Sequence, residues 1–260
     1  MTAGRHVFSC IALFAAVMLA SCADDVRDQG SVLVAAASDL RPAFDELGAM
    51  FEEDTGTAVT FTYGSSGVLR EQILDGAPFQ IFASANTSFV DEVIAAGRAD
   101  SATRATYAFG RLVVIAAPGV EPPGTLEELS DIVTVNGSDR RIAIANPEHA
   151  PYGIAAQQAL ATVGVLDVVR SRLVLGESVA DAVRIVESGN AEFGIVARSL
   201  AIAADLPHVD IPPDLHAPIE QTLVVTREGD ANARTFAEFL RSDRAREVLA
   251  KYGFAEPGQA

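Results

Sequence analysis

Short apolar runs separated by segments with helical periodicity constrain the fold of this chain more than any other feature. The runs are rich in β-branched residues, which is typical of buried strands. They comprise residues 32–34, 59–63, 81–83, 112–115, 142–144, 173–175, 193–196 and 223–225. Amphipathic patterns lie between most of them; Phe44, Leu47 and Phe51, for example, share one helical face. Strands that alternate with helices predict α/β layers with largely parallel sheets.

The first 22 residues have the plan of a secretory signal peptide. Arg5 begins a short positive segment, residues 7–20 are apolar, and Leu-Ala-Ser-Cys ends the stretch at Cys22. The apolar part is shorter than the ~20 residues that a membrane span needs. Its end is similar to the lipobox of bacterial lipoproteins, in which cleavage leaves the cysteine as the acylated first residue. We therefore predict lipidation of Cys22; ordinary cleavage near Ala23 is the alternative.

Charge and cysteine content limit how the mature part of the chain can be stabilised and what it can bind. The other cysteine, Cys10, lies in the leader, so we expect no disulfide in the mature domain, whose stability must come from a core. About 238 residues remain after Cys22, enough for one large domain or two small ones. They hold 18 basic and 35 acidic residues, a formal net charge of −17. Nucleic acid and anionic lipid surfaces are poor partners for such a chain.

Four small-residue turns follow strand-like runs and open helical segments. They are Ala35-Ala36-Ala37-Ser38, Gly64-Ser65-Ser66-Gly67, the stretch from Pro147 to Gly153, and Ser178-Val179. Small and hydroxyl residues at helix starts leave backbone N–H groups available to bind an anion. One such turn is commonly a plain helix cap. Four of them in a chain without a catalytic motif predict an oxyanion receptor.

Other interpretations of these turns find less support. The Gly64–Gly67 turn is not followed by the Gly-Lys-Ser/Thr of a phosphate loop, and it does not match a Gly-x-Ser-x-Gly nucleophile elbow. Glu148 and His149 invite an acid–base or metal site, but no second ligand has the required spacing. We expect His149 to be a turn residue bonded to nearby backbone. The sequence therefore predicts neither an enzyme nor a cofactor or metal site.

Motifs along nearly the whole mature chain, in order, resemble the molybdate-binding proteins of bacterial ABC transporters. They are Ala35–Ser38, Ser65-Ser66, Ala77-Pro78, Ser84-Ala85, Pro147-Glu148-His149, Gly194-Ile195-Val196 and Lys251–Phe254. The resemblance implies a type II periplasmic-binding-protein fold, in which two α/β lobes with mixed, mainly parallel sheets surround a central cleft. Lobe I would comprise residues 30–111 plus 222–260, and lobe II residues 112–221.

The resemblance also assigns binding residues. Ser38 and Ser66 would donate hydroxyl and backbone N–H groups from one lobe, and Tyr152 and Val179 would donate backbone N–H groups from the other. Ala197 stands where some members have a tyrosine whose hydroxyl binds the ligand.

Two neighbouring positions bear on selectivity. Gln80 replaces an aspartate that is usual in the family. Asp39 offers an acceptor that a protonated anion such as phosphate would need. At a helix start, however, we expect its carboxyl to face the helix dipole.

The implied function is capture of molybdate, and of the similarly sized tungstate, for delivery to a membrane permease. The protein would be a periplasmic or cell-surface monomer that meets the membrane only through the lipid on Cys22. A receptor for sulfate, thiosulfate or another oxyanion is the first alternative. An enzyme on the same scaffold is the second.

Overall fold

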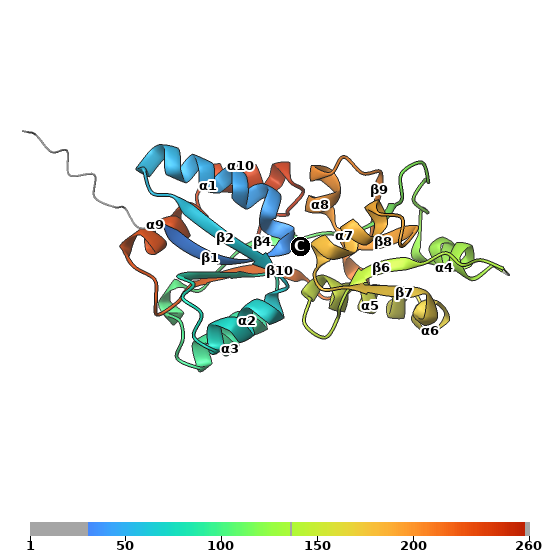
Figure 1. The fold of residues 1–260 in the computed structure, drawn as a ribbon, viewed down its shortest axis with the longest axis horizontal. Coiled ribbons are helices and arrows are strands. Elements are labelled where there is room, and N and C mark those ends of the chain that lie inside the picture. Colours follow the sequence, from blue (N-terminus) through green and yellow to red (C-terminus); the bar gives the residue numbers. More distant parts are fainter. Residues whose placement is uncertain (1–30, 136, 258–260) are drawn as a thin grey trace, which may run out of the picture.

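Two five-stranded sheets lie side by side in the computed structural model, which describes residues 31–135 and 137–257 (Figure 1). The first has the order β2-β1-β3-β10-β4, and the second β7-β6-β8-β5-β9. We call each sheet with its helices lobe I and lobe II. The strands of lobe I are β1 (Val32–Ala37), β2 (Val59–Gly64), β3 (Ile81–Ser84), β4 (Ala105–Gly110) and β10 (Ile219–Val225). Those of lobe II are β5 (Leu112–Ala116), β6 (Ile142–Ala145), β7 (Leu173–Gly176), β8 (Phe193–Ala197) and β9 (His208–Asp210).

Both sheets are mixed and follow the same plan. In lobe I, β1 pairs in parallel with β2 and β3, whereas β10 runs antiparallel to β3 and β4. In lobe II, β6 pairs in parallel with β7 and β8, whereas β5 runs antiparallel to β8 and β9. The predicted two-lobed α/β class is confirmed. The predicted runs all form strands, and β4 and β9 are additional.

Helices cover both faces of the lobe I sheet. The helical segments are η1 (Ser38–Leu40), α1 (Arg41–Thr55), α2 (Ser66–Leu74), α3 (Thr87–Ala95), η2 (Ser101–Thr103), α9 (Ala231–Phe239) and α10 (Asp243–Lys251). In Figure 1, α1 and α10 lie on one side of the strands and α2 and α3 on the other. The alternation of side chains in β1 explains this: Val34 joins the core with Phe44, while Ala35 joins the core of α2 and α3.

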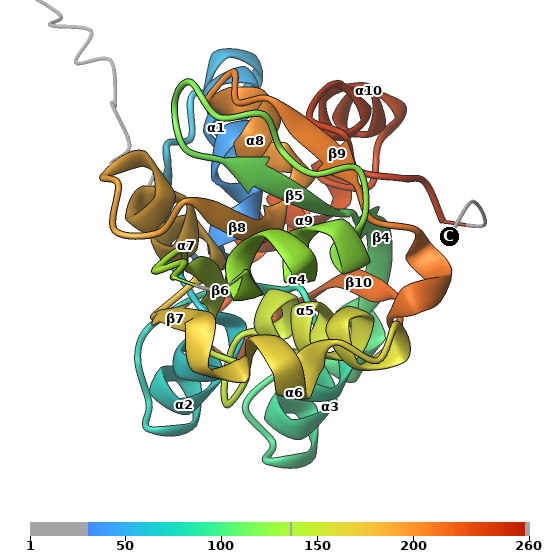
Figure 2. The same ribbon diagram turned by 90° about the vertical axis from the view of Figure 1, so that its right-hand side faces the viewer.

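Lobe II has the same layered arrangement. Its helical segments are α4 (Leu126–Thr134), α5 (Pro151–Thr162), α6 (Leu166–Val169), η3 (Arg170–Arg172), α7 (Val179–Glu187), α8 (Arg198–Ala203) and η4 (Pro213–Leu215). Figure 2 shows α8 above β5 and β8, and α4, α5 and α6 below the strands. Within the described residues no single helix is long and apolar enough to cross a membrane. Taken together, α5 and the segment formed by α6 and η3 have the length and composition of a span, but the two parts are bent by 119°.

The chain passes between the lobes twice. Arg111 alone separates β4 of lobe I from β5 of lobe II, and the chain returns between η4 and β10. Because β10 joins the lobe I sheet at Ile219, the return lies before residue 222, and the exact division into lobes stays a prediction. The predicted signal peptide, with Cys22, lies outside the described residues.

Candidate functional site

A small cavity lies between the lobes, at the starts of four helical segments. Lobe I contributes the starts of η1 and α2, and lobe II those of α5 and α7. The lining residues are Ala37, Ser38, Asp39, Gly64, Ser65, Ser66, Ala85, Ala150, Pro151, Tyr152 and Val179. All four predicted ligand-binding residues, Ser38, Ser66, Tyr152 and Val179, are therefore brought together at one place.

The two serines of lobe I are buried and their oxygens accept backbone hydrogen bonds. Ser66 is the first residue of α2, and its Oγ accepts from the N–H of Ala85 at 3.1 Å. Ser38 follows β1 directly, and its Oγ accepts from the N–H of Ala180 in lobe II at 3.3 Å. A hydroxyl that accepts in this way still has its own proton to donate.

Lobe II presents backbone donors from two helix starts. Val179 is the first residue of α7, after the N-cap Ser178, whose Oγ accepts from the N–H of Asp181 at 3.2 Å. Tyr152 is the second residue of α5, because Pro151 occupies the first position. Amide N–H groups in the first turn of a helix have no carbonyl partner within that helix, and the helix dipole makes this end positive. Both helices thus offer donors suited to an anion.

The described residues that line the cavity include no lysine, arginine or histidine. Attraction for an anion at this place would therefore come from uncharged hydroxyl and amide groups. Such donors bind a charged acceptor with roughly 1.5–3 kcal/mol for each hydrogen bond. Several of them together offset the weak, screened repulsion from surface carboxylates.

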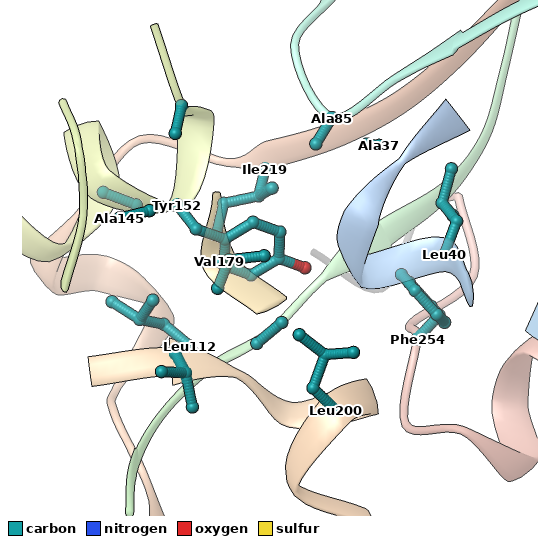
Figure 3. Packing of buried hydrophobic residues seen from close by; sticks show 14 of the residues in the cluster. Ala37, Leu40, Ala85, Leu112, Ala145, Tyr152, Val179, Leu200, Ile219 and Phe254 are labelled. Atoms are coloured by element: carbon teal, nitrogen blue, oxygen red, sulfur yellow. The ribbon is translucent and has the colours of Figure 1, made fainter. Parts of the chain in front are cut away.

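Asp39 is the one carboxylate of the lining, and it is fully buried. Its Oδ2 accepts from the Tyr152 hydroxyl at 3.0 Å and from Nε2 of Gln221 at 2.7 Å. Figure 3 shows the ring of Tyr152 near Val179 and Ile219, with its oxygen directed toward the segment of Ala37 and Leu40. Burial raises the pKa of the Asp39 carboxyl to about 7, although hydrogen bonds from Tyr152, from its own backbone and from Gln221 act to lower it. The sequence interpretation, a carboxyl facing the helix dipole, missed both partners.

A second set of contacts joins the lobes beside the cavity. The N–H of Gly67 donates to the carbonyl oxygen of His149 at 2.9 Å, and the Ser65 Oγ lies 2.7 Å from Nδ1 of His149. As expected, His149 is a turn residue bonded to nearby backbone, since its N–H donates to the Asn146 carbonyl at 3.3 Å, but its ring pairs with a serine of the other lobe. No three His, Cys, Asp or Glu side chains gather as a metal-binding group in the part of the chain that the structure describes.

The two departures from the family pattern lie outside the cavity lining. Ala197 is buried at the end of β8. Gln80 has a structural position: its Oε1 accepts from the N–H of Leu33 at 3.0 Å, and its own N–H donates to the Leu33 carbonyl at 2.8 Å. These bonds fix the segment before β3 to β1.

Comparisons with known proteins agree with this architecture. Residues 32–255 match the family described as bacterial extracellular solute-binding protein. The molybdate-binding protein ModA of Rhodobacter capsulatus is 35% identical over 228 residues, which cover 86% of this chain and 88% of that protein. ModA of Escherichia coli is 32% identical over 92% of this chain and 95% of its own length. The solved periplasmic molybdate-binding protein of Azotobacter vinelandii superposes with a TM-score of 0.79 at 33% identity, covering 87% of this chain and 100% of that one. The chain therefore belongs to the bacterial extracellular solute-binding proteins and, among them, to the ModA family.

Proposed function

We propose that this protein captures molybdate outside the cytoplasm and delivers it to the membrane permease of an ABC transporter. One observation carries the proposal: helix starts from both lobes and two serine hydroxyls converge on a single cavity whose described lining has no cationic side chain. The relatives named as molybdate-binding proteins supply the choice of anion.

The binding residues of this proposal are Ser38 and Ser66 from lobe I and Tyr152 and Val179 from lobe II. The serines would donate hydroxyl and N–H groups, and the other two would donate backbone N–H groups. The donors of these four residues favour an anion without a proton of its own, because a bound proton needs an acceptor. Tungstate has the same charge as molybdate and nearly the same size, so it would bind as well.

Capture would proceed by closure of the lobes around the anion. Donors from both lobes then reach one ion, which shifts the population toward the closed arrangement. Binding and release, without a chemical step, is the activity that follows, in keeping with a family of solute-binding proteins.

The location of the protein follows from its leader. Acylation of Cys22 would hold the domain at a membrane surface, near the permease that receives the anion. The family description places such proteins outside the cytoplasm. The lipid anchor and the monomeric state are parts of this proposal.

Isothermal titration calorimetry of the protein without residues 1–22 tests the function. We expect tight binding of molybdate and tungstate, and weak or absent heat with sulfate and phosphate. Equal affinity for sulfate and molybdate would show that the protein binds oxyanions in general rather than molybdate specifically. Absence of binding with all four anions would refute the proposal.

A further inference from the structure

Asp39 lies at the contact between the two lobes, next to β10, the strand that follows the return of the chain from lobe II to lobe I. It comes from η1 of lobe I, Tyr152 comes from α5 of lobe II, and Gln221 comes from β10, just after the chain returns from lobe II. The Ser199 Oγ of lobe II also donates to the Asp39 main-chain carbonyl at 2.8 Å. The carboxyl is thus enclosed by groups from both sides and adjoins the ligand cavity.

The hydrogen bonds of this cluster are incomplete. Oδ1 of Asp39 is buried without a hydrogen-bond partner, and so are Oε1 of Gln221 and the hydroxyl of Tyr107. Asp39 takes part in no salt bridge among the described residues. A buried, ionised carboxylate with one oxygen unsatisfied and no cation beside it is strongly unfavourable, and such a group takes up a proton instead.

The titratable groups near the carboxyl do not supply the missing positive charge. Burial raises the pKa values of the Tyr107 and Tyr152 hydroxyls well above the ordinary value, so both stay neutral. His149, before α5, is bonded to Ser65 through its ring.

Charged side chains on the neighbouring elements have partners elsewhere. Arg41 of α1 lies over the Tyr63 ring, Arg184 of α7 pairs with Asp181, Arg198 of α8 pairs with Asp210, and Glu220 of β10 accepts from Thr87. The environment of Asp39 therefore favours the neutral carboxyl.

We infer that Asp39 is protonated when the lobes close on a dianion, so that the protein takes up a proton together with its ligand. This inference rests on the proposed function and names the charge state of the same site. An ionised Asp39 would repel a dianion in the adjoining cavity, whereas a neutral one adds no charge. A protonated Asp39 would also exclude anions that carry a hydrogen, such as hydrogen phosphate. Such an anion needs an acceptor, which only the ionised carboxylate would supply.

The direction of the pH effect follows from linkage. With the lobes apart, Tyr152 would no longer cover the Asp39 carboxyl, so water would reach it and its pKa would fall toward the ordinary value of about 3.9. With the lobes closed the pKa is about 7, and a dianion nearby raises it further. Between these values the closed form binds the additional proton. Affinity for the dianion should therefore increase as the pH falls from 8 to 6, by at most about tenfold per pH unit.

Calorimetry in buffers of equal pH but different ionisation enthalpies counts the protons. With molybdate at pH 6.5, we expect the wild-type protein to take up about one proton per ion bound. Asp39→Asn, which keeps the shape and the hydrogen bonds but cannot titrate, should take up none and bind with an affinity that is constant between pH 6 and 8. Glu46→Gln is the control, because Glu46 is a carboxylate bonded to Lys251 and Tyr252 rather than to groups of the cavity. It should keep the wild-type proton count.

The outcomes separate this inference from the proposed function. If molybdate binds without proton uptake, or if Asp39→Asn takes up as many protons as the wild type, the inference is wrong while the function stands. If sulfate binds instead, the same count is made with sulfate. Tighter binding of hydrogen phosphate than of molybdate would show an ionised Asp39. Should Asp39→Asn fail to fold, the wild-type count and its pH dependence decide alone.

Discussion

The backbone N–H of Gly67 donates to the carbonyl oxygen of His149 at 2.9 Å, and this bond joins the start of α2 in lobe I to the turn before α5 in lobe II. A methyl group at residue 67 would lie 2.6 Å from that oxygen and 2.9 Å from the His149 Cβ. Since one of these atoms belongs to the backbone, it cannot swing away as a flexible side chain would. Glycine at this position lets the lobes approach.

Gly67→Ala should therefore hinder closure with little effect on lobe I itself, because alanine is favourable within a helix. We expect molybdate affinity to fall about tenfold or more, a factor that corresponds to 1.4 kcal/mol. Calorimetry measures the affinity, and urea unfolding reports the stability. Gly124→Ala is a matched control, since the added methyl group would meet only a side-chain oxygen of Glu128, at 3.4 Å. Equal affinities of the two variants would show that close approach at residue 67 is not required.

Ser38→Ala and Ser66→Ala test the donors of lobe I. Each removes a buried hydroxyl at the cavity, and we expect a loss of about 1–3 kcal/mol of binding free energy. Ser242→Ala provides a contrast: Ser242 caps α10, so its loss should lower stability by roughly 0.5–2 kcal/mol without changing affinity. Wild-type affinity in both cavity variants would move the binding site elsewhere.

Asp39→Asn should change how stability depends on pH. The folded carboxyl has a pKa of about 7, and the unfolded one a value of about 3.9. The folded protein therefore binds more protons between these pH values, and its stability falls as the pH rises through them. Asparagine removes that loss. The free energy of unfolding of the variant, relative to the wild type, should therefore rise by up to about 1.4 kcal/mol per pH unit. Urea unfolding with saturating molybdate at pH 5 and pH 8 measures the gain; a difference independent of pH would contradict it.

Cys22→Ala tests the anchor. If Cys22 carries the lipid, the variant should leave the membrane fraction and appear in the soluble extracytoplasmic fraction. Metabolic labelling with a fatty acid gives a direct readout, since the wild type should incorporate label and the variant should not. Unchanged fractionation of the two proteins would favour ordinary cleavage near Ala23.

Local sequence patterns predicted most of this architecture. Runs of β-branched residues marked the buried strands, while β4 and β9 were missed because Thr106 interrupts the apolar pattern of the first and the second is only three residues long. The turns at helix starts include most of the residues that line the cavity, but not Asp39 or Ala85, since a small residue after a strand is visible in the sequence alone.

Contacts between distant residues could not be predicted in this way. Asp39 and Tyr152 are 113 positions apart, and Ser65 and His149 are 84 apart. No periodicity links such pairs, because they meet only when both lobes have folded and closed. The preference of Asp39 for a helix start was correctly recognised, but its neutral charge state depends on burial by Tyr152 and Gln221 from outside its own segment.

The position of β10 governs the order in which the lobes can be completed. Its residues 219–225 lie between β3 and β4 in the sheet of lobe I, yet they form the last strand among the described residues. During synthesis from the N-terminus, the sheet of lobe I therefore stays divided until all strands of lobe II have emerged. A chain that meets a translocation channel before that moment has not yet completed the sheet of lobe I.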